Sequence, residues 1–262
     1  MFTINPFSEL SGLISPLAMQ LYVIAMILLV AGGTVLDMIH KKSAEYFFKN
    51  AEKAKAEASQ SVSVVKKATI AVTTVAVDVL TSGEFCNQQR RQAHLLTMYG
   101  FILFAATTAI MIFGYIGADT PVILPLLWHL GALMLCVGGY WFWFFIRVDV
   151  AAEGNPWYRV IRADLFVLSL LATATFALIW SFMQAVGASS LSMLFFGLFI
   201  LSSTVLFGGV LWSKFAHMFF KPAAAFQKRI AKADGSRDGL PEPADRPEQF
   251  GPGIKRLLPK NY

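Results

Sequence analysis

GEFCNQQRRQAHLLTMY, residues 83–99, changes from a polar loop to two arginines, then a histidine, and then the apolar beginning of a helix. Arg90, Arg91 and His94 therefore lie where a membrane span is expected to meet water. A cation pair beside an imidazole at that depth can hold an anion, a quinone or haem propionates. The topology of the chain follows from the apolar runs on either side of this stretch.

The composition is that of a polytopic membrane protein. Of the 262 residues, 56% are hydrophobic, 15% are charged and 23 are Phe, which is more apolar surface than a soluble domain of this length needs. The net charge of +6 does not indicate nucleic-acid binding, because the basic residues follow the membrane topology. The two cysteines, without a CxxC pair, argue against a zinc or iron–sulfur site.

The apolar runs predict an all-α protein with five transmembrane helices. A run of roughly 20 apolar residues crosses a bilayer. The expected organisation is an outer-face segment over 1–17, a first span over 18–40, an amphipathic loop over 41–93, a four-span bundle over 94–217 and a tail over 218–262. Within the bundle we expect spans at about 94–115, 122–146, 163–186 and 191–216.

The basic residues predict the orientation. Of 22 Lys and Arg, nine lie in 41–92, three in 147–162 and nine in 218–262, and the last is Lys214. Since positive loops stay inside, the N-terminus is expected outside and the C-terminus in the cytoplasm, with the chain crossing the membrane several times.

The two long polar segments are expected to behave differently. In the loop, residues 42–58 are rich in helix formers, and residues 62–80 predict an amphipathic helix on the membrane or against a partner, although their β-branched content would also suit a strand. The tail contains six of the eleven prolines, so we expect it to be extended unless a partner orders it.

Three of the four histidines lie at the predicted inner ends of spans: His40, His94 and His217. Two imidazoles at one depth can ligate a b-type haem, so the trio allows one haem, with His94 and His217 as the preferred metal ligands and Arg90 or Arg91 on the propionates. His129 has no partner at its own depth, and a hydrogen bond to a neighbouring helix would explain it. Interfacial histidines that contact headgroups or cap helices are the alternative.

The same residue types suit a haem-free quinone site. A quinone needs a hydrogen-bond donor at each carbonyl and a path for protons from water. The cofactor-binding candidates at the inner edge are Asp37, His40, Arg90, Arg91, His94, Tyr99 and His217. No Walker loop, catalytic triad or HExxH motif occurs in the sequence, which argues against a self-contained ATPase or hydrolase.

Three stretches carry a resemblance to a known family: MIHKKSAEYFFKNAEKAK (38–55), TSGEFCNQQRRQAHLLTMYGFILF (81–104) and KFAHMFFKPAAAFQKR (214–229). They resemble the membrane anchor subunit of dissimilatory adenylylsulfate reductase from sulfur-oxidising bacteria. The five-span plan is more distantly similar to the b-haem quinone modules of nitrate reductase and heterodisulfide reductase. That distant type carries two histidines on each of two helices, whereas this chain has one on each.

The resemblance implies a function. The partner would be a cytoplasmic flavin and iron–sulfur heterodimer that oxidises sulfite with AMP, docked on the loop over 41–93 and the tail over 218–262. The resemblance also implies a multi-pass protein of the bacterial inner (cytoplasmic) membrane. The anchor, in contact with membrane lipid, would pass the electrons to quinone as a quinone-reducing or non-catalytic subunit. Two alternatives are a redox-inactive tether and a small transporter or channel, although the nearly apolar span centres argue against the latter.

Overall fold

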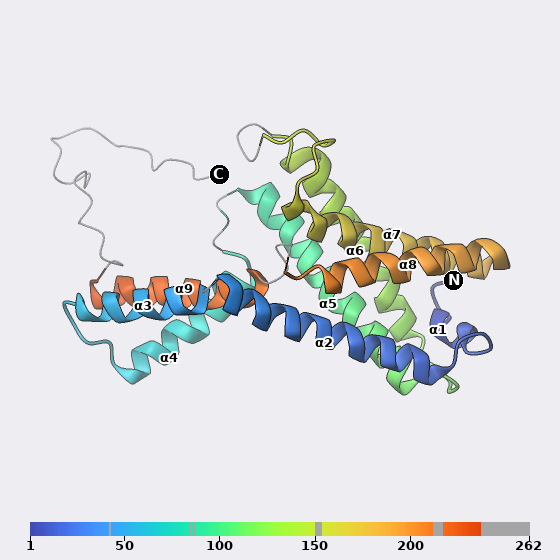
Figure 1. Ribbon diagram of the computed structural model, residues 1–262, viewed down its shortest axis with the longest axis horizontal. Coiled ribbons are helices and arrows are strands. Elements are labelled where there is room, and N and C mark those ends of the chain that lie inside the picture. The colour runs from blue at the N-terminus through green and yellow to red at the C-terminus, as the bar shows by residue number, and fades with distance from the viewer. Residues whose placement is uncertain (42, 84, 86, 150–153, 212–216, 237–262) are drawn as a thin grey trace. The chain divides into compact units, whose positions relative to one another are not determined.

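The computed structural model describes all residues except 42, 84, 86, 150–153, 212–216 and 237–262, and for 41, 43, 44, 46 and 217–220 it describes only the backbone. The described residues form helices and no strand. They divide into two compact units (Figure 1). The membrane unit comprises Met1–Asp37 and Gln89–Ala216, and the second unit comprises Met38–Gln88 and His217–Tyr262.

Five helices are long and apolar enough to span a membrane, as the sequence predicts, and the chain is a multi-pass membrane protein. They are α2 (Pro16–Lys41), α5 (Gln88–Gly114), α6 (Ile123–Trp141) with the wider-turned η2 (Phe142–Ile146), α7 (Leu165–Ala185) after the short η3 (Arg162–Asp164), and α8 (Ser189–Gly208).

Two helices have bounds that differ from those of the predicted spans. α5 begins at Gln88, before the predicted start of the second span at His94, because a helix needs backbone hydrogen bonds and not apolar side chains, and long basic side chains can extend toward water. α8 ends at Gly208, at a pair of glycines where helix propensity falls. The fifth span was predicted to reach residue 216, and residues 212–216 lie outside the described part of the chain.

Glycines let α5 and α6 approach each other closely. A Cβ on Gly131 would stand 2.7 Å from the backbone nitrogen of Phe104, and one on Gly100 would stand 2.8 Å from the carbonyl oxygen of Gly131. A Cβ on Gly138 would likewise stand 2.7 Å from the carbonyl oxygen of Ala93. Backbone contact of this kind is typical of packing between membrane helices. The hydrophobic effect does not drive helix association inside lipid, so the helices associate through the close van der Waals packing that small residues allow.

An aromatic core fills one end of the membrane unit. Trp128 and Trp180 are fully buried with their ring centroids 6.2 Å apart, and Phe7 contacts both. Phe7 belongs to α1 (Pro6–Leu10), which Asn5 caps by accepting a hydrogen bond from the Phe7 nitrogen. Within the N-terminal segment, Pro6, Phe7 and Leu10 are buried, whereas Leu13 and Leu17 are exposed. Its expected position on the outer face stays a prediction.

Polar contacts hold α1 against the ends of the spans. The Asn5 amide donates to the Thr120 hydroxyl at 3.1 Å, and the Gln184 amide donates to the Pro6 carbonyl at 3.0 Å. The Ser8 hydroxyl donates to the carbonyl of Tyr115 at 3.2 Å. These bonds satisfy backbone and side-chain groups at the ends of helices, which would otherwise lack partners.

The second unit is helical and is built from both polar segments. Its elements are α3 (Ser43–Ala56), α4 (Val64–Thr73), η1 (Thr74–Leu80), whose turns are wider than those of an α-helix, and α9 (His217–Asp234). The predicted loop helices are confirmed, and the alternative of a strand over 62–80 is wrong. The extended tail is wrong over 217–234, where α9 packs against α3, α4 and η1. Residues 237–262 lie outside the described part of the chain.

The contacts within the second unit constrain the topology. The backbone nitrogens of Ser59 and Gln60 both donate to the carbonyl of Asp234, at 3.0 and 3.1 Å. Four spans separate these residues in the sequence. An even number of crossings returns the chain to the side it left, so the loop and α9 can meet only if the number of crossings between them is even, as four spans provide. The contacts are therefore consistent with the predicted number of spans.

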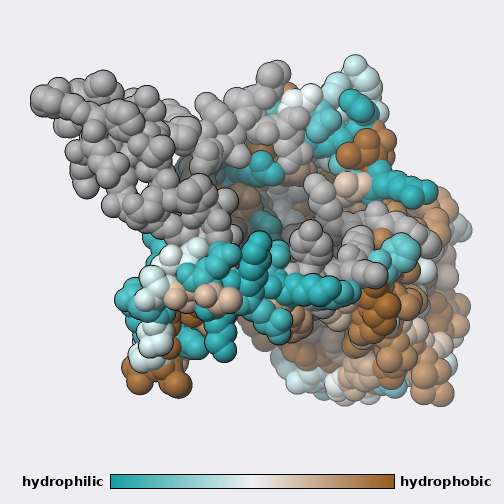
Figure 2. All heavy atoms as spheres, turned by 60° about the vertical axis from the view of Figure 1, so that its left-hand side comes forward, coloured by the Kyte–Doolittle hydropathy of each residue, from teal (hydrophilic) through white to brown (hydrophobic). Residues whose placement is uncertain are grey.

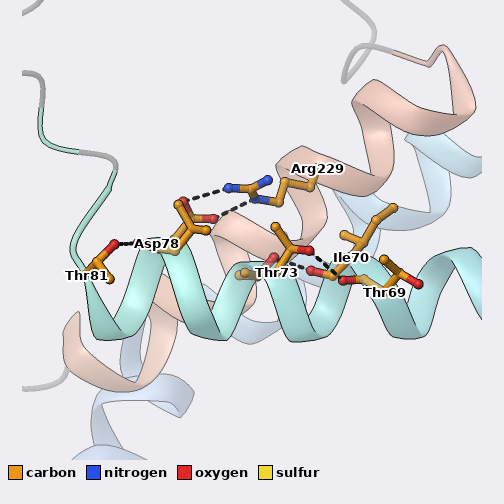
Figure 3. Close-up of polar contacts among 8 residues, drawn as sticks. Thr69, Ile70, Thr73, Asp78, Thr81 and Arg229 are labelled. Carbon is orange, nitrogen blue, oxygen red and sulfur yellow. Dashed lines mark hydrogen bonds and ion pairs between the residues drawn. The ribbon is translucent and has the colours of Figure 1, made fainter.

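The main ion pair of the second unit joins η1 to α9 (Figure 3). Arg229 donates from Nε and Nη2 to the two carboxylate oxygens of Asp78, at 2.6 and 2.9 Å. Bidentate pairs of this geometry are the stronger class of charged hydrogen bond. These hydrogen bonds hold the pKa of Asp78 below its ordinary value of 3.8.

This pair predicts an acid-sensitive second unit. Because folding lowers the Asp78 pKa, the pair stabilises the fold above pH 3.8, and the stabilisation is lost as the pH falls below that value. Asp78→Asn should therefore lower the unfolding temperature at neutral pH, and the difference from wild type should vanish in acid. Thermal unfolding followed by circular dichroism across this pH range measures it. Glu57→Gln, at an exposed carboxylate of the same unit, should change little. An Asp78→Asn deficit that persists unchanged in acid would contradict the assignment.

Candidate functional site

The candidate site is built around the first two turns of α5. Arg90 and Arg91 lie in its first turn. His94 follows four residues after Arg90 and three residues after Arg91, so the imidazole shares a helix surface with both guanidinium groups. All three side chains are half-buried, and each has interactions within the structure. The helix places them at the boundary between the polar segment and the apolar span.

The chemistry of this cluster suits an anionic or electron-accepting ligand. Two guanidinium groups carry permanent positive charge, and the N-terminal end of the helix adds the partial positive charge of the helix dipole. An imidazole beside them can donate a hydrogen bond and can also exchange a proton near neutral pH. Charge, donation and proton exchange are what the reduction of a quinone requires.

The other predicted residues of the inner edge lie in different surroundings. Tyr99 is on the same helix, but five residues after His94 it points to a different face and is 38% exposed. Asp37 near the end of α2 is buried at 3% exposure, whereas His40, three residues later, is exposed. The structure thus brings Arg90, Arg91 and His94 together and does not add Tyr99 to them.

The predicted haem ligands fall in separate units. His94 belongs to the membrane unit, and His217 is the first residue of α9 in the second unit rather than the last residue of a span. The side chain of His217 lies outside the described part of the structure. Among the described residues, His, Cys, Asp and Glu form no group of three or more that could hold a metal ion. Ligation of a haem by His94 and His217 stays a prediction.

His129 has the structural role that one interpretation of the sequence gives it. Its Nδ1 donates to the carbonyl of Pro125 at 2.7 Å, and its Nε2 then accepts from the Ser181 hydroxyl on the neighbouring helix at 2.8 Å. The predicted hydrogen bond to a neighbouring helix is confirmed. Both ring nitrogens are occupied, and the side chain is buried in the aromatic core.

Sequence reasoning missed the role of Arg147, which follows the aromatic run at the end of the third span. Its side chain is 1% exposed, and it donates to the carbonyls of Pro156 and Arg159 at 2.8 and 2.6 Å. It also forms an ion pair with Asp164 at 2.5 Å, and its guanidinium group lies 4.3 Å from the centre of the Trp143 ring. The sequence signal was an arginine and an aspartate at the two ends of one connection between spans.

The Arg147 cluster organises the connection between the third and fourth spans. One oxygen of the Asp164 carboxylate also accepts from the backbone nitrogen of Ile161 at 2.9 Å, which fixes the beginning of the fourth span. The described residues of this connection are thus tied to a single buried guanidinium group. We assign this cluster to folding rather than to ligand binding.

No family model matches this chain, and no curated protein and no solved structure matches it either.

Proposed function

We propose that this protein is the membrane anchor of a peripheral oxidoreductase and passes electrons from that partner to membrane quinone. The observation that carries the proposal is the second unit. The chain folds its two polar segments together into one helical body, joined by the contacts of Ser59 and Gln60 with Asp234 and of Asp78 with Arg229. A chain that only crossed the membrane would not need such a body.

The basic residues give the side on which the partner would dock. Both segments of the second unit belong to the regions where Lys and Arg gather, which the positive-inside rule assigns to the cytoplasm. The α5 cluster of Arg90, Arg91 and His94 follows directly after the loop segment. Electrons from a docked iron–sulfur protein would therefore arrive at the edge of the membrane where quinone can accept them.

The resemblance to the adenylylsulfate reductase anchor supplies the reaction. In the partner, an oxygen of the AMP phosphate forms a bond to the sulfur of sulfite, and two electrons leave as adenylylsulfate forms. The quinone takes up these two electrons and two protons and becomes a quinol. In this proposal His94 donates to a quinone carbonyl and relays a proton, and Arg90 and Arg91 stabilise the negative charge that develops on the oxygen.

Co-purification tests the proposal. Mild-detergent extracts should yield the chain together with a flavin and iron–sulfur heterodimer, and the complex should reduce a quinone when sulfite and AMP are added. A dithionite-reduced absorption spectrum of the isolated anchor then tells whether one b-type haem takes part. A stable complex that reduces a soluble dye but no quinone would show that the chain is a redox-inactive tether. The absence of any such partner would overturn the proposal.

A further inference from the structure

The helix formed by α4 and η1 exposes an apolar stripe, and its packed side carries polar groups beside the half-buried Ile70 and Ala71. Val65 is 77% exposed, Val72 69% and Leu80 48%, and at helical spacing these residues form one stripe, which Ala68 and Ala76 complete. The opposite side carries Thr74, which is 2% exposed, and Asp78, which forms the ion pair with Arg229 of α9. A helix in water would be oriented the other way, so the exposed stripe requires an apolar environment.

A basic hollow lies along the side of the same helix. It has a volume of about 330 Å³ and is lined by Lys66, Thr69 and Thr73 of α4 and by Arg229 and Lys232 of α9, together with the apolar Ile70 and Ala233. Figure 3 shows Arg229 reaching Asp78 beside Thr69 and Thr73. In the described part of the structure, neither Lys66 nor Lys232 forms an ion pair, and the Nη1 of Arg229 has no hydrogen-bond partner. The hollow therefore contains two lysines without an ion-pair partner among the described residues, beside an arginine that is already paired with Asp78.

The charge of the hollow selects an anion. The Thr69 and Thr73 hydroxyls donate to the carbonyls of their own helix, those of Val65 and Thr69 at 3.0 and 2.8 Å. Ligand contacts in the hollow are thus left mainly to the ammonium groups and the remaining guanidinium nitrogen. These donors suit the tetrahedral oxygens of a phosphate group. Lys67 adds a further positive charge at the beginning of the helix.

We infer that α4–η1 lies in the membrane surface, with its valine and leucine stripe among the lipid chains and the phosphate of an anionic phospholipid in the hollow of Lys66, Arg229 and Lys232. The pairing of an apolar stripe with adjacent lysines is typical of helices that lie in the interface. The helix has 17 residues, about 25 Å at 1.5 Å per residue, and its lysines and aspartate prevent it from spanning.

The connectivity of the chain supports this occupant over a protein partner. The second unit follows α2 directly, precedes α5 directly and receives α9 after the last span, so it cannot leave the membrane. A lipid surface is therefore always within reach of the stripe. In Figure 2 a group of hydrophobic residues is exposed below the hydrophilic residues at the lower left, as a surface of this kind requires. The inference concerns lipid contact alone and does not depend on the redox proposal.

Site-directed spin labelling of the full-length chain tests the placement of the stripe. In a Cys86→Ser, Cys136→Ser background, a nitroxide is attached at Val72→Cys, at Val65→Cys as a second stripe position, or at Lys53→Cys on the exposed side of α3 as the control. In nanodiscs of phosphatidylcholine and phosphatidylglycerol, the stripe labels should collide with oxygen several-fold more than the control and should be shielded from a water-soluble nickel complex. Equal exposure to nickel at all three positions would overturn the inference, as would shielding that appears only when a protein partner is added.

Calorimetric titration of the protein in neutral detergent tests the hollow. Short-chain phosphatidylglycerol should bind more tightly than short-chain phosphatidylcholine or inorganic phosphate. The Lys66→Gln, Lys232→Gln variant should weaken that binding by about five-fold per lysine, since a basic residue near an anionic surface contributes about 1 kcal/mol. Lys53→Gln, Lys55→Gln removes the same charge from α3 and should leave binding unchanged. Equal binding of inorganic phosphate and phosphatidylglycerol would overturn the lipid assignment, and so would equal weakening by both variants.

Discussion

Replacing Arg147 with alanine is expected to lower the free energy of unfolding by about 3–5 kcal/mol, the usual cost of removing one partner from a buried ion pair. The variant leaves the Asp164 carboxylate without its cation and the carbonyls of Pro156 and Arg159 without their donor. It also removes the cation that lies against the Trp143 ring. No other cation among the described residues contacts Asp164.

Two measurements in detergent check this expectation. Thermal unfolding should shift to lower temperature, and chymotrypsin should cut faster at the exposed Trp157 and Tyr158, because the connection around Arg147 opens more often. The double variant Arg147→Ala, Asp164→Ala should be less destabilised than the sum of its two single variants, since the two residues act as a pair.

Arg159→Ala is the matched control. It removes the same type of side chain from the same connection and the same positive charge from the topology, but the Arg159 side chain is exposed and its carbonyl still accepts from Arg147. Its effect should stay within about 0.5 kcal/mol, as for most surface substitutions. Equal stability of Arg147→Ala and Arg159→Ala would refute the role of the buried guanidinium group.

Replacing His94 with alanine should abolish quinone-linked electron transfer by the complex while the complex still assembles. The loss of a positioned acid–base group typically costs about 10²–10⁴-fold in rate. The readout is quinone reduction with sulfite and AMP, compared with reduction of a soluble dye by the same preparation. The dye rate should not change, because in this proposal the dye takes electrons from the partner without passing through α5.

Gln92→Ala provides the control for His94. It lies in the same turns of α5, but its side chain is exposed. It should retain full quinone reduction and full assembly. Full quinone reduction by His94→Ala would rule out its role, and loss of the dye rate together with the quinone rate would indicate a docking defect instead. If the isolated anchor shows a b-type haem spectrum, its loss in His94→Ala would identify this imidazole as a ligand.

The membrane helices could be predicted from the sequence because a bilayer constrains length and polarity so strongly. A helix of 20 residues just crosses the hydrocarbon core, and the apolar runs reach that length with few charges. The span ends were harder. Beyond Gly208 the chain continues with aromatic and aliphatic residues, so hydropathy alone extends the last span toward residue 216. Residues 212–216 lie outside the described part.

The second unit could be predicted only in part, because its order depends on contacts between distant segments. Residues 43–80 carry helical signals of their own. The beginning of the tail was expected to be extended because its composition was averaged with the proline-rich end. Over 217–234 the chain nevertheless forms an amphipathic helix that contains Pro222. Arg229 of this helix pairs with Asp78, which lies 151 residues earlier in the sequence. Local propensity cannot report a pairing at that distance.

The candidate site was predictable where it is local and not where it is tertiary. Arg90, Arg91 and His94 share a helix surface because of their spacing, which the sequence alone contains. The assignment of His94 and His217 to different units depends on where the last span ends. The buried state of Arg147 likewise depends on carbonyl groups nine and twelve residues away. In the sequence, Arg147 counts only as one of the basic residues that predict orientation, and that count cannot reveal its role in folding.

The joining of residues 59–60 to residues 233–234 sets an order of events during biogenesis. When the ribosome has made the loop segment, four helices must still be threaded into the lipid before α9 emerges and closes this body. A chain that stalls or inserts with one crossing missing leaves the two halves on opposite sides of the bilayer. Any protein that binds only the completed body would thus not be recruited by molecules in which a single crossing is missing.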